Sequence, residues 1–397
     1  MIKLIEKSSR KINTINNLYN RFLLNKVNWN HKLISILGSR GVGKTTLLLQ
    51  YLKQLQKPNH EVLYVSMDDI YFTNNLLVDL VNEFVKHGGK ILALDEVHKY
   101  PNWSREVKNI YDDYRDLQII ITGSSLLEIK KGDADLSRRS VDYILPTLSF
   151  REFIMFENNT VFPAYTLSDI LNSHEEIAKE INQKVKPLFY YQKFIKSGAY
   201  PFFIDAKEEF SGQLLKTIHL LLESDLISVL NIDYSHIIKL KKLLLLISES
   251  VPFKPNISEL SSKVGITRDS VMNYFEYLQK AHLIFMLCSA NKGFRRFEKP
   301  EKIYLNDCNQ LFAISSAEPN IGTIRETFFL QHLNAISKLN YTESGDFLVD
   351  EKFIFEIGGK NKSFAQIKDL SNSFIAADSI EYGLKNKIPL WMFGFVY

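Results

Sequence analysis

Residues 38 to 45 read Gly38-Ser39-Arg40-Gly41-Val42-Gly43-Lys44-Thr45, which is a complete G-x-x-x-x-G-K-[ST] phosphate-binding loop. The apolar run from Leu33 to Leu37 predicts a buried strand before the loop, and leucines at helical spacing from Thr45 to Leu55 predict a helix after it. The glycines let the backbone curl so that successive N–H groups face inward, and the helix N-terminus adds positive partial charge. Because strand, loop and helix follow in the required order, we predict that this chain binds a nucleoside triphosphate.

The loop also predicts the role of each side chain. We expect Lys44 to reach the β and γ phosphates and the Thr45 hydroxyl to bind Mg²⁺. The predicted cofactors are therefore ATP and Mg²⁺, although the sequence leaves ATP and GTP open as alternatives. The residues expected to contact the nucleotide are Gly38, Ser39, Arg40, Gly41, Val42, Gly43, Lys44, Thr45 and Thr46.

A second apolar run, from Ile91 to Leu94, ends in the acids Asp95 and Glu96, as a Walker B strand does. A buried strand that delivers Asp95 at its carboxyl end places this residue beside Thr45, where it would hold Mg²⁺ mainly through water. Glu96 is then expected to orient or deprotonate the attacking water. A solvated loop is the alternative interpretation of the acidic pair alone, and the phosphate-binding loop upstream makes that alternative weaker.

A third apolar strand runs from Leu117 and ends in the small polar stretch Thr122 to Ser125. Thr122 or Ser124 is expected to act as a sensor that hydrogen-bonds the γ-phosphate or the lytic water. A plain Gly-Ser turn is the alternative for any one of these hydroxyls.

The remaining pattern of the first 150 residues predicts an α/β domain. Strands at 62–66 and 143–145 and helices at 74–86 and 103–114 complete five strands in a parallel, doubly wound sheet. Residues 1–30 are expected to form a helical lead-in. Its apolar face would consist of Ile12, Ile15, Leu18 and Phe22.

These motifs, followed by Leu136 to Arg139 and by the Pro146 to Phe153 stretch P-T-L-S-F-R-E-F, resemble a prokaryotic family of AAA+ ATPases. The resemblance covers nearly all 397 residues and implies a winged helix and then a C-terminal domain with a nuclease-like core. In that family an arginine follows L-S-G. Arg139 takes this place here, but Arg138 replaces the glycine, so both are candidates for a finger on the γ-phosphate of a neighbouring subunit in a homo-oligomer. A basic loop face is the alternative.

Composition indicates a multidomain protein of a reducing compartment. A length of 397 residues suggests two to four domains, and the two cysteines are too few for a disulfide framework. The sequence begins without an uninterrupted apolar segment, so we expect a cytoplasmic protein with no membrane partner. The net charge of +4 is too small to establish nucleic-acid binding.

We predict four domains from the change of pattern along the chain. They are the P-loop α/β domain with its lead-in at 1–148, a helical lid and linker at 149–250, a winged helix-turn-helix at 251–310, and an α+β nuclease-like domain at 311–397.

The predicted winged helix has a short helix from Ile257 to Val264, a turn at Gly265, and a second helix capped by Thr267. The second helix would bury Val271, Tyr274, Phe275 and Leu278 and expose Arg268, Ser270, Asn273 and Tyr277. The wing strands are expected at 283–287 and 302–305, with the basic, aromatic stretch 291–299 between them.

This pattern suits contact with double-stranded DNA, because basic and aromatic side chains bind phosphates and bases. Asp269 and Glu276 lie on the same helix and oppose a phosphate backbone. Docking of a protein partner is therefore the alternative role for this domain.

Near the end of the chain, Asp346 and Glu356 flank two predicted strands and resemble the acids of the PD-(D/E)xK nuclease core. There, a lysine two residues after the glutamate supports metal-dependent cleavage. That position is Gly358 here, and Lys360 is expected to be displaced from the strand face. A degenerate nuclease fold used for binding or dimerisation is therefore favoured over nuclease activity.

Three functions are consistent with these features. The leading hypothesis is an ATPase that hydrolyses ATP to drive or control action on or near DNA. The second is a slowly hydrolysing switch whose bound nucleotide controls docking of a protein partner. The third is a metal-dependent nuclease regulated by ATP.

Overall fold

The computed structural model describes residues 1–397 apart from 17, 125–135, 228–232, 251, 291–298 and 369. The chain forms two compact units. The first, which we call the P-loop unit, contains Met1–Pro146 together with Leu220–Tyr234, and the second, the C-terminal unit, contains Thr147–His219 and Ser235–Tyr397. The segment Leu220–Tyr234 therefore groups with the P-loop unit, although the sequence on either side of it belongs to the other unit.

A five-stranded parallel sheet forms the centre of the P-loop unit, with the strand order β2-β3-β4-β1-β5. The strands are β1 (Leu33–Leu37), β2 (Val62–Ser66), β3 (Ile91–Asp95), β4 (Gln118–Gly123) and β5 (Val141–Ile144). Every residue of β1 and β3 is buried, as expected for strands covered on both faces. The predicted parallel α/β fold is therefore confirmed.

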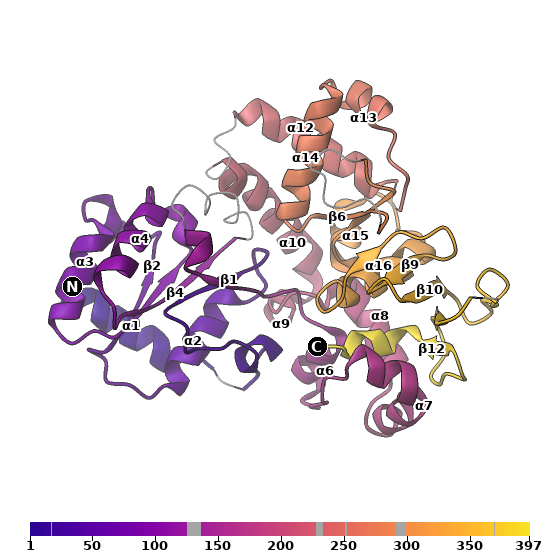
Figure 1. Cartoon of the computed structure of the whole chain (residues 1–397), viewed down its shortest axis with the longest axis horizontal. Helices are drawn as coiled ribbons and strands as arrows, with labels where there is room; N and C mark the ends of the chain where they lie inside the picture. The colour runs from indigo at the N-terminus through magenta and orange to yellow at the C-terminus, as the bar shows by residue number, and fades with distance from the viewer. Residues whose placement is uncertain (17, 125–135, 228–232, 251, 291–298, 369) are drawn as a thin grey trace. The chain divides into compact units, whose positions relative to one another are not determined.

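Helices flank this sheet (Figure 1). Helices α3 (Leu77–Lys86) and α4 (Trp103–Asp113) pack their apolar sides against alternate strand residues such as Leu63, Leu92 and Ile119 in one core cluster. Alternate residues of a strand point to the same face of a sheet, so these two helices cover one face. Helix α2 (Lys44–Gln54) follows the phosphate-binding loop and buries its own leucines outside that cluster.

The lead-in differs from its prediction. Helix α1 spans Ile2–Thr14 and ends because Ile15 is extended, and Leu18 is 67% exposed, so the predicted face does not form. Instead α1 buries Leu4 and Ser8, and the Ser8 hydroxyl accepts a hydrogen bond from the Tyr64 N–H of β2 at 2.9 Å. Because β2 is an edge strand, this contact satisfies a main-chain donor that the sheet leaves unpaired. The helical spacing of apolar residues in the sequence does not predict this hydrogen bond.

The first half of the C-terminal unit is helical, as predicted. Its longer helices are α6 (Phe150–Asn158), α7 (Leu167–Lys184), α8 (Pro187–Ser197), α10 (Phe210–Leu220) and α12 (Tyr234–Ser248), with the short helix α9 (Phe203–Ala206) between α8 and α10. The backbone stays helical beyond α10 through a π-helical turn, η7 (Leu221–Asp225). The chain therefore enters the P-loop unit on a helical segment.

The P-T-L-S-F-R-E-F stretch has a structural explanation. Ser149 and Glu152 form a capping box that starts α6, and both residues are buried. The Ser149 hydroxyl and the Arg151 Nε each donate to the main-chain oxygen of Tyr397 at 2.8 Å. The signature thus joins the start of the C-terminal unit to a residue almost 250 positions later, as the separations of 248 and 246 show.

The predicted helix-turn-helix elements are present. Helix α13 spans Ile257–Val264, Gly265 ends it with a φ of 75°, and Thr267 caps α14 (Arg268–Lys280). All four residues predicted for the inner face are buried, and β6 (Ile284–Leu287) pairs antiparallel with β7 (Lys302–Leu305). Of the four residues predicted to be exposed, Arg268 and Asn273 are exposed, whereas Ser270 and Tyr277 are half-buried.

A second sheet has the strand order β12-β11-β10-β9-β8 and confirms a separate sheet in the C-terminal region. Its strands are β8 (Leu339–Asn340), β9 (Phe347–Val349), β10 (Phe353–Gly358), β11 (Ser373–Ala377) and β12 (Lys387–Pro389). Helices α15 (Cys308–Ile314) and α16 (Ile321–Leu333) precede it, and the 3-10 helix η8 (Leu390–Phe395) follows it. Within the part of the chain that the structure describes, no helix combines the length and apolar character needed to cross a membrane.

The surroundings of His332, at the end of α16, predict that acid destabilises the C-terminal unit. Its Nε2 accepts from the Phe150 N–H at 3.0 Å, its Nδ1 lies 2.8 Å from the Phe328 carbonyl oxygen, and burial lowers its pKa to about 4. In the unfolded chain a histidine has a pKa of about 6.5. Between the two pKa values the unfolded chain therefore binds more protons than the folded chain does. We expect unfolding free energy to fall by roughly 3 kcal/mol as pH drops from about 6.5 to about 4.

Urea unfolding of the wild type and of His332→Gln across this pH range tests the expectation. Glutamine offers both a donor and an acceptor but does not titrate, so its pH dependence should be shallower by that amount. Equal slopes for the two proteins would assign the acid sensitivity to other groups.

Candidate nucleotide site

The phosphate-binding loop lies at the carboxyl end of β1 and has the backbone that its glycines predict. Gly38 has a φ of 152°, and a Cβ built on it would lie 2.4 Å from the Leu145 carbonyl oxygen, so no side chain fits there. Gly43 has a φ of 96° and stands at the N-cap of α2, where a left-handed residue lets the N–H groups turn inward. The loop therefore has the conformation of an anion cradle that opens onto a helix N-terminus.

Lys44 is held inside this cradle. Its Nζ donates to the main-chain oxygens of Gly38 at 2.9 Å and Ser39 at 2.8 Å. Burial lowers the pKa of Lys44 to about 8, although the negative charges of Glu96 and Asp95 favour its charged form. The ammonium is thus partly desolvated before any phosphate arrives.

Asp95 is the centre of the site and is only 3% exposed. Its Oδ2 accepts from the Thr45 hydroxyl at 2.8 Å and from the Tyr64 hydroxyl at 2.7 Å, and its Oδ1 accepts from Thr122. Three parallel strands and the start of α2 therefore meet at one carboxylate, since the carboxyl ends of parallel strands share one edge of the sheet. The structure brings Thr45 and Asp95 together as the sequence predicts.

Glu96 follows Asp95 in an uncommon backbone conformation. Its φ of 53° and ψ of 47° are left-handed, and its N–H donates to the Thr122 hydroxyl at 3.1 Å. A non-glycine residue pays about 1 kcal/mol or more for this region, and such residues are concentrated at functional sites. The turn directs the chain away from the strand at the residue expected to handle the lytic water, and Glu96 is half-buried.

Thr122 links the two acids, because the same hydroxyl donates to Asp95 and accepts from the Glu96 N–H. It is fully buried, and Ser124 is 3% exposed. Ser125 lies outside the described residues. Which hydroxyl senses the γ-phosphate stays a prediction, but the contacts of Thr122 suit a residue that positions Asp95 and Glu96.

The two candidate arginines have different surroundings. Arg139 follows η5 (Leu136–Arg138), and its Nε and Nη2 donate to the carboxylate oxygens of Asp112 at 3.1 and 3.2 Å. Its guanidinium also lies 5.9 Å from the Tyr111 ring. Arg138 is exposed. The finger assignment to Arg139 stays a prediction.

Two residues that contact the loop carry no sequence motif. Arg21, 3% exposed, donates to the Val42 carbonyl oxygen at 2.5 Å and to the Pro146 carbonyl oxygen at 2.8 Å. It thereby joins the lead-in, the loop and the end of β5. Asp225 is 1% exposed and accepts hydrogen bonds from Arg40 of the loop and from Lys99. Both contacts join residues far apart in the sequence, and only the folded chain shows them.

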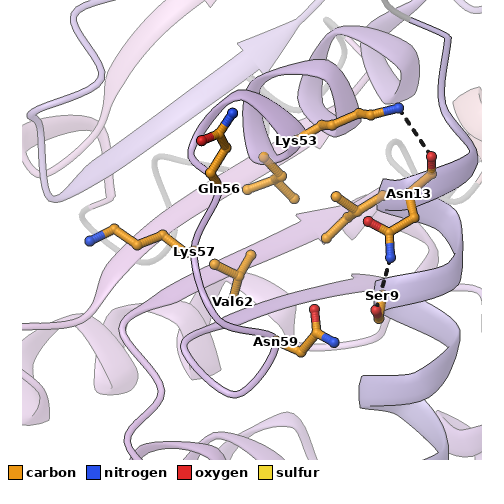
Figure 2. Close-up of a pocket in the computed structure, with 9 residues that line it drawn as sticks. Ser9, Asn13, Lys53, Gln56, Lys57, Asn59 and Val62 are labelled. Carbon is orange, nitrogen blue, oxygen red and sulfur yellow. Dashed lines mark hydrogen bonds between the residues drawn. The ribbon is translucent and has the colours of Figure 1, made fainter.

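A separate cavity of about 70 Å³ lies between α1, the end of α2 and the start of β2 (Figure 2). Figure 2 shows Lys53 and Asn13 at its rim, with the Lys53 ammonium donating to the Asn13 carbonyl oxygen at 3.0 Å. Because α2 begins at the carboxyl edge of the sheet and ends here, this cavity belongs to the opposite edge. None of the predicted site residues lines it.

The C-terminal acids also come together. Asp346 Oδ2 accepts from the Ile357 N–H at 2.8 Å, and Glu356 is 3% exposed. Glu356 forms an ion pair with Lys362, a lysine that the sequence prediction did not consider. A Cβ built on Gly358 would lie 2.8 Å from the Lys362 side chain, so this lysine covers the position that the nuclease motif gives to its own lysine.

Glu326 of α16 interacts electrostatically with these acids. Burial raises the pKa of Glu326 most, and the negative charges of Asp346 and Glu356 raise it further. In the described parts of the chain, however, no group of three or more His, Cys, Asp and Glu side chains is arranged to hold a metal ion. The nuclease-like character of this domain stays a prediction.

Comparison with known proteins agrees with the P-loop site. Residues 30–154 match the family described as AAA domain, and residues 189–320 match a family described as Domain of unknown function (DUF8612). Residues 30–154 therefore form an AAA domain, and the predicted resemblance to prokaryotic AAA+ ATPases is confirmed for this domain.

Two relatives come from Methanocaldococcus jannaschii. Uncharacterized protein MJ1637 is 28% identical over 286 residues, which cover 68% of this chain and 60% of the relative. Uncharacterized protein MJ1544 is 27% identical over 354 residues, covering 85% of this chain and 74% of the relative. The chain thus spans about three-fifths of the length of the first relative.

Two solved structures have low similarity. The replication initiator DnaA bound to AMPPCP and single-stranded DNA is 16% identical with a TM-score of 0.31, covering 70% of this chain and 86% of that chain. The Aeropyrum pernix ORC1 protein in complex with DNA is 13% identical with a TM-score of 0.31, covering 72% and 88%. Scores at this level carry no conclusion about the function of this chain.

Proposed function

We propose that this protein binds ATP with Mg²⁺, hydrolyses it, and uses the cycle to drive or control action on or near DNA. The observation that carries the proposal is the connected set Thr45, Asp95, Thr122 and Glu96 at the mouth of the phosphate-binding loop. Transfer of a phosphoryl group to water needs a hydroxyl and a carboxylate that bind the cation, and an acid that acts on the water. Thr45, Asp95 and Glu96 would supply these three groups.

The residues present fit both ligands. The loop N–H groups and Lys44 would bind the β and γ phosphates, and the Thr45 hydroxyl and Asp95 carboxylate, 2.8 Å apart, are oxygen donors of the kind that Mg²⁺ prefers. Mg²⁺, when bound, neutralises charge on the phosphates. Because Mg²⁺ sites of this kind use phosphate and water oxygens, two protein donors suffice.

Glu96 would accept the proton of the attacking water or orient that water. Thr122 would fix the positions of Glu96 and Asp95 relative to each other. Ser124 is the remaining candidate for the sensor of the γ-phosphate. Arg139 would act on a neighbouring subunit of a homo-oligomer once its guanidinium leaves Asp112.

The link to DNA rests on the α13–α14 elements, which we propose form a winged helix. The exposed Arg268 and Asn273 lie on α14, where a recognition helix would contact DNA. Glu276 forms an ion pair with Lys280 at 2.7 Å, so its negative charge is partly neutralised. Glu276 should therefore repel a DNA backbone less strongly than the sequence suggests. The repulsion expected from Asp269 is not reduced by this contact.

Steady-state ATP hydrolysis with and without double-stranded DNA tests the proposal. We expect turnover to rise with DNA and Arg268→Gln to remove that rise while DNA-free turnover persists. Lys360→Gln, which removes one exposed positive charge from the second sheet region, serves as the matched control. Turnover that ignores DNA, or ATP binding without turnover, would favour the switch that docks a protein partner.

The lowered pKa of Lys44 predicts how nucleotide binding depends on pH. Only its protonated form attracts phosphate, and its pKa of about 8 in the empty site lies below that of an exposed lysine. Affinity for ATP should therefore be constant below this pKa and fall roughly tenfold between about pH 7 and pH 9. Titrations with a fluorescent ATP analogue measure this. In Lys44→Arg the guanidinium stays protonated, so any binding that persists should lack the decline.

A further inference from the structure

Asp225 is a buried carboxylate surrounded by cations in the P-loop unit. Its Oδ1 accepts from the Lys99 ammonium at 2.8 Å, and Arg40 Nη1 lies 3.3 and 3.4 Å from its two oxygens. His98 Nε2 lies 3.5 Å from the same Oδ1, and Ser224 accepts from Lys99 at 2.8 Å. Burial acts to raise the pKa of Asp225, but His98 and Lys99 outweigh it and hold the pKa at about 2. The group is therefore an anion at any pH where the protein works.

The cations that hold Asp225 belong to the nucleotide site. Arg40 is the third residue of the phosphate-binding loop, and Lys99 closes the short helix η3 (Val97–Lys99) that directly follows Glu96. Asp225 and Arg40 both act on the charge of Lys44, the residue expected to bind the β and γ phosphates. Asp225 thus contacts one cation of the loop itself and one that lies three residues after Glu96, on the side where we expect the outermost phosphate of a triphosphate.

A carboxylate and a terminal phosphate cannot share these cations without cost, because like charges repel strongly where water is excluded. A diphosphate lacks the γ group and leaves the cations with Asp225. A triphosphate offers Arg40 and Lys99 an anion with more charge and three acceptor oxygens. A buried carboxylate that loses the charges of Arg40 and Lys99 is then driven toward water.

We propose that Asp225 is a built-in counter-anion of the triphosphate site: it holds Arg40 and Lys99 while the γ-phosphate is absent and releases them when a nucleoside triphosphate binds. This inference rests on the proposed nucleotide binding. It makes residues 220–227 the element that distinguishes triphosphate from diphosphate. The element is suited to such a change because it contains the π-helical turn η7, a rare helix form that is found frequently at functional sites.

Hydrogen exchange of residues 220–227 tests the proposal in the full chain. We expect their amides to exchange severalfold faster with the non-hydrolysable ATP analogue AMPPNP than with ADP, because loss of Arg40 and Lys99 frees the turn. Exchange that slows with AMPPNP, or is the same with both nucleotides, overturns the proposal. This measurement needs no substitution, so it does not depend on whether a variant folds.

The variant Asp225→Asn gives a second, independent test. Removing the competing anion should tighten AMPPNP binding by roughly tenfold and leave ADP binding within about twofold. Weaker AMPPNP binding by a folded variant would show that Asp225 assists the site instead, and would overturn the proposal. Glu61→Gln is the matched control, because it removes one negative charge from a residue just before β2, at the opposite edge of the sheet.

The two proposals fail in different ways. If neither AMPPNP nor ADP binds, the proposed function itself is wrong and the inference fails with it. If both nucleotides bind and Glu96 supports turnover, but residues 220–227 do not respond, only the role of Asp225 is overturned.

Discussion

Glu96→Gln is expected to lower ATP turnover by about a hundredfold to ten-thousandfold, the usual contribution of a general base, while ATP affinity changes little. The amide keeps the size of the carboxylate but neither accepts a proton nor carries the charge that orients the water. Its main-chain contact with Thr122 does not involve the side chain, so the left-handed turn and the Asp95 network should persist. Steady-state phosphate release and ATP binding, measured on the same preparation, separate the two effects.

Glu61→Gln is the appropriate control, since it makes the same chemical change at a half-buried glutamate, paired with Lys90, at the far edge of the sheet. Its turnover should match the wild type. Turnover within about tenfold of the wild type in Glu96→Gln would remove Glu96 from the chemistry, given the size expected of a general base. Loss of ATP binding together with turnover would instead assign Glu96 to the binding of nucleotide.

Lys44→Ala is expected to weaken ATP binding by about tenfold to a hundredfold, which corresponds to loss of a charge-assisted hydrogen bond of roughly 1.5–3 kcal/mol. In our assignment the half-buried Lys44 ammonium reaches the β and γ phosphates directly. Its present partners, the Gly38 and Ser39 carbonyl oxygens, belong to the loop itself, so the truncated loop loses two internal contacts as well. Calorimetric or fluorescence titration with ATP measures the change.

Lys53→Ala provides a control on the same helix. Lys53 lies near the end of α2 and donates to the Asn13 and Ile15 carbonyl oxygens, at the rim of the cavity in Figure 2. Its loss should cost some stability of the lead-in and leave ATP affinity unchanged. Equal weakening by both substitutions would indicate a general effect on α2 rather than a phosphate contact of Lys44.

The sequence was most informative where neighbouring residues determine both structure and chemistry. Apolar runs of four or five residues predicted β1, β3 and β4, and the polar residues that follow them predicted the edge at which Thr45, Asp95 and Thr122 meet. This worked because parallel strands present their carboxyl ends together, so order along the chain determines proximity in space.

The prediction failed where one contact outweighs periodicity. The lead-in was assigned a face by helical spacing, but the Ser8 hydroxyl and the unpaired edge of β2 determine which side of α1 is buried. Arg21 and Asp225 were missed for a related reason. Each is a charged residue in an unremarkable stretch, and each acquires its role through partners between 21 and 185 positions away. Only tertiary structure carries that information.

Lys362 has a consequence for how substitutions in the second sheet combine. Its side chain passes over Gly358 so closely that a Cβ at position 358 would meet it at 2.8 Å. A side chain at 358 therefore excludes the present path of Lys362, and truncation of Lys362 opens the space that position 358 would need. Positions 358 and 362 are thus expected to be epistatic: a lysine at either one can serve Glu356, whereas lysines at both compete for a single volume.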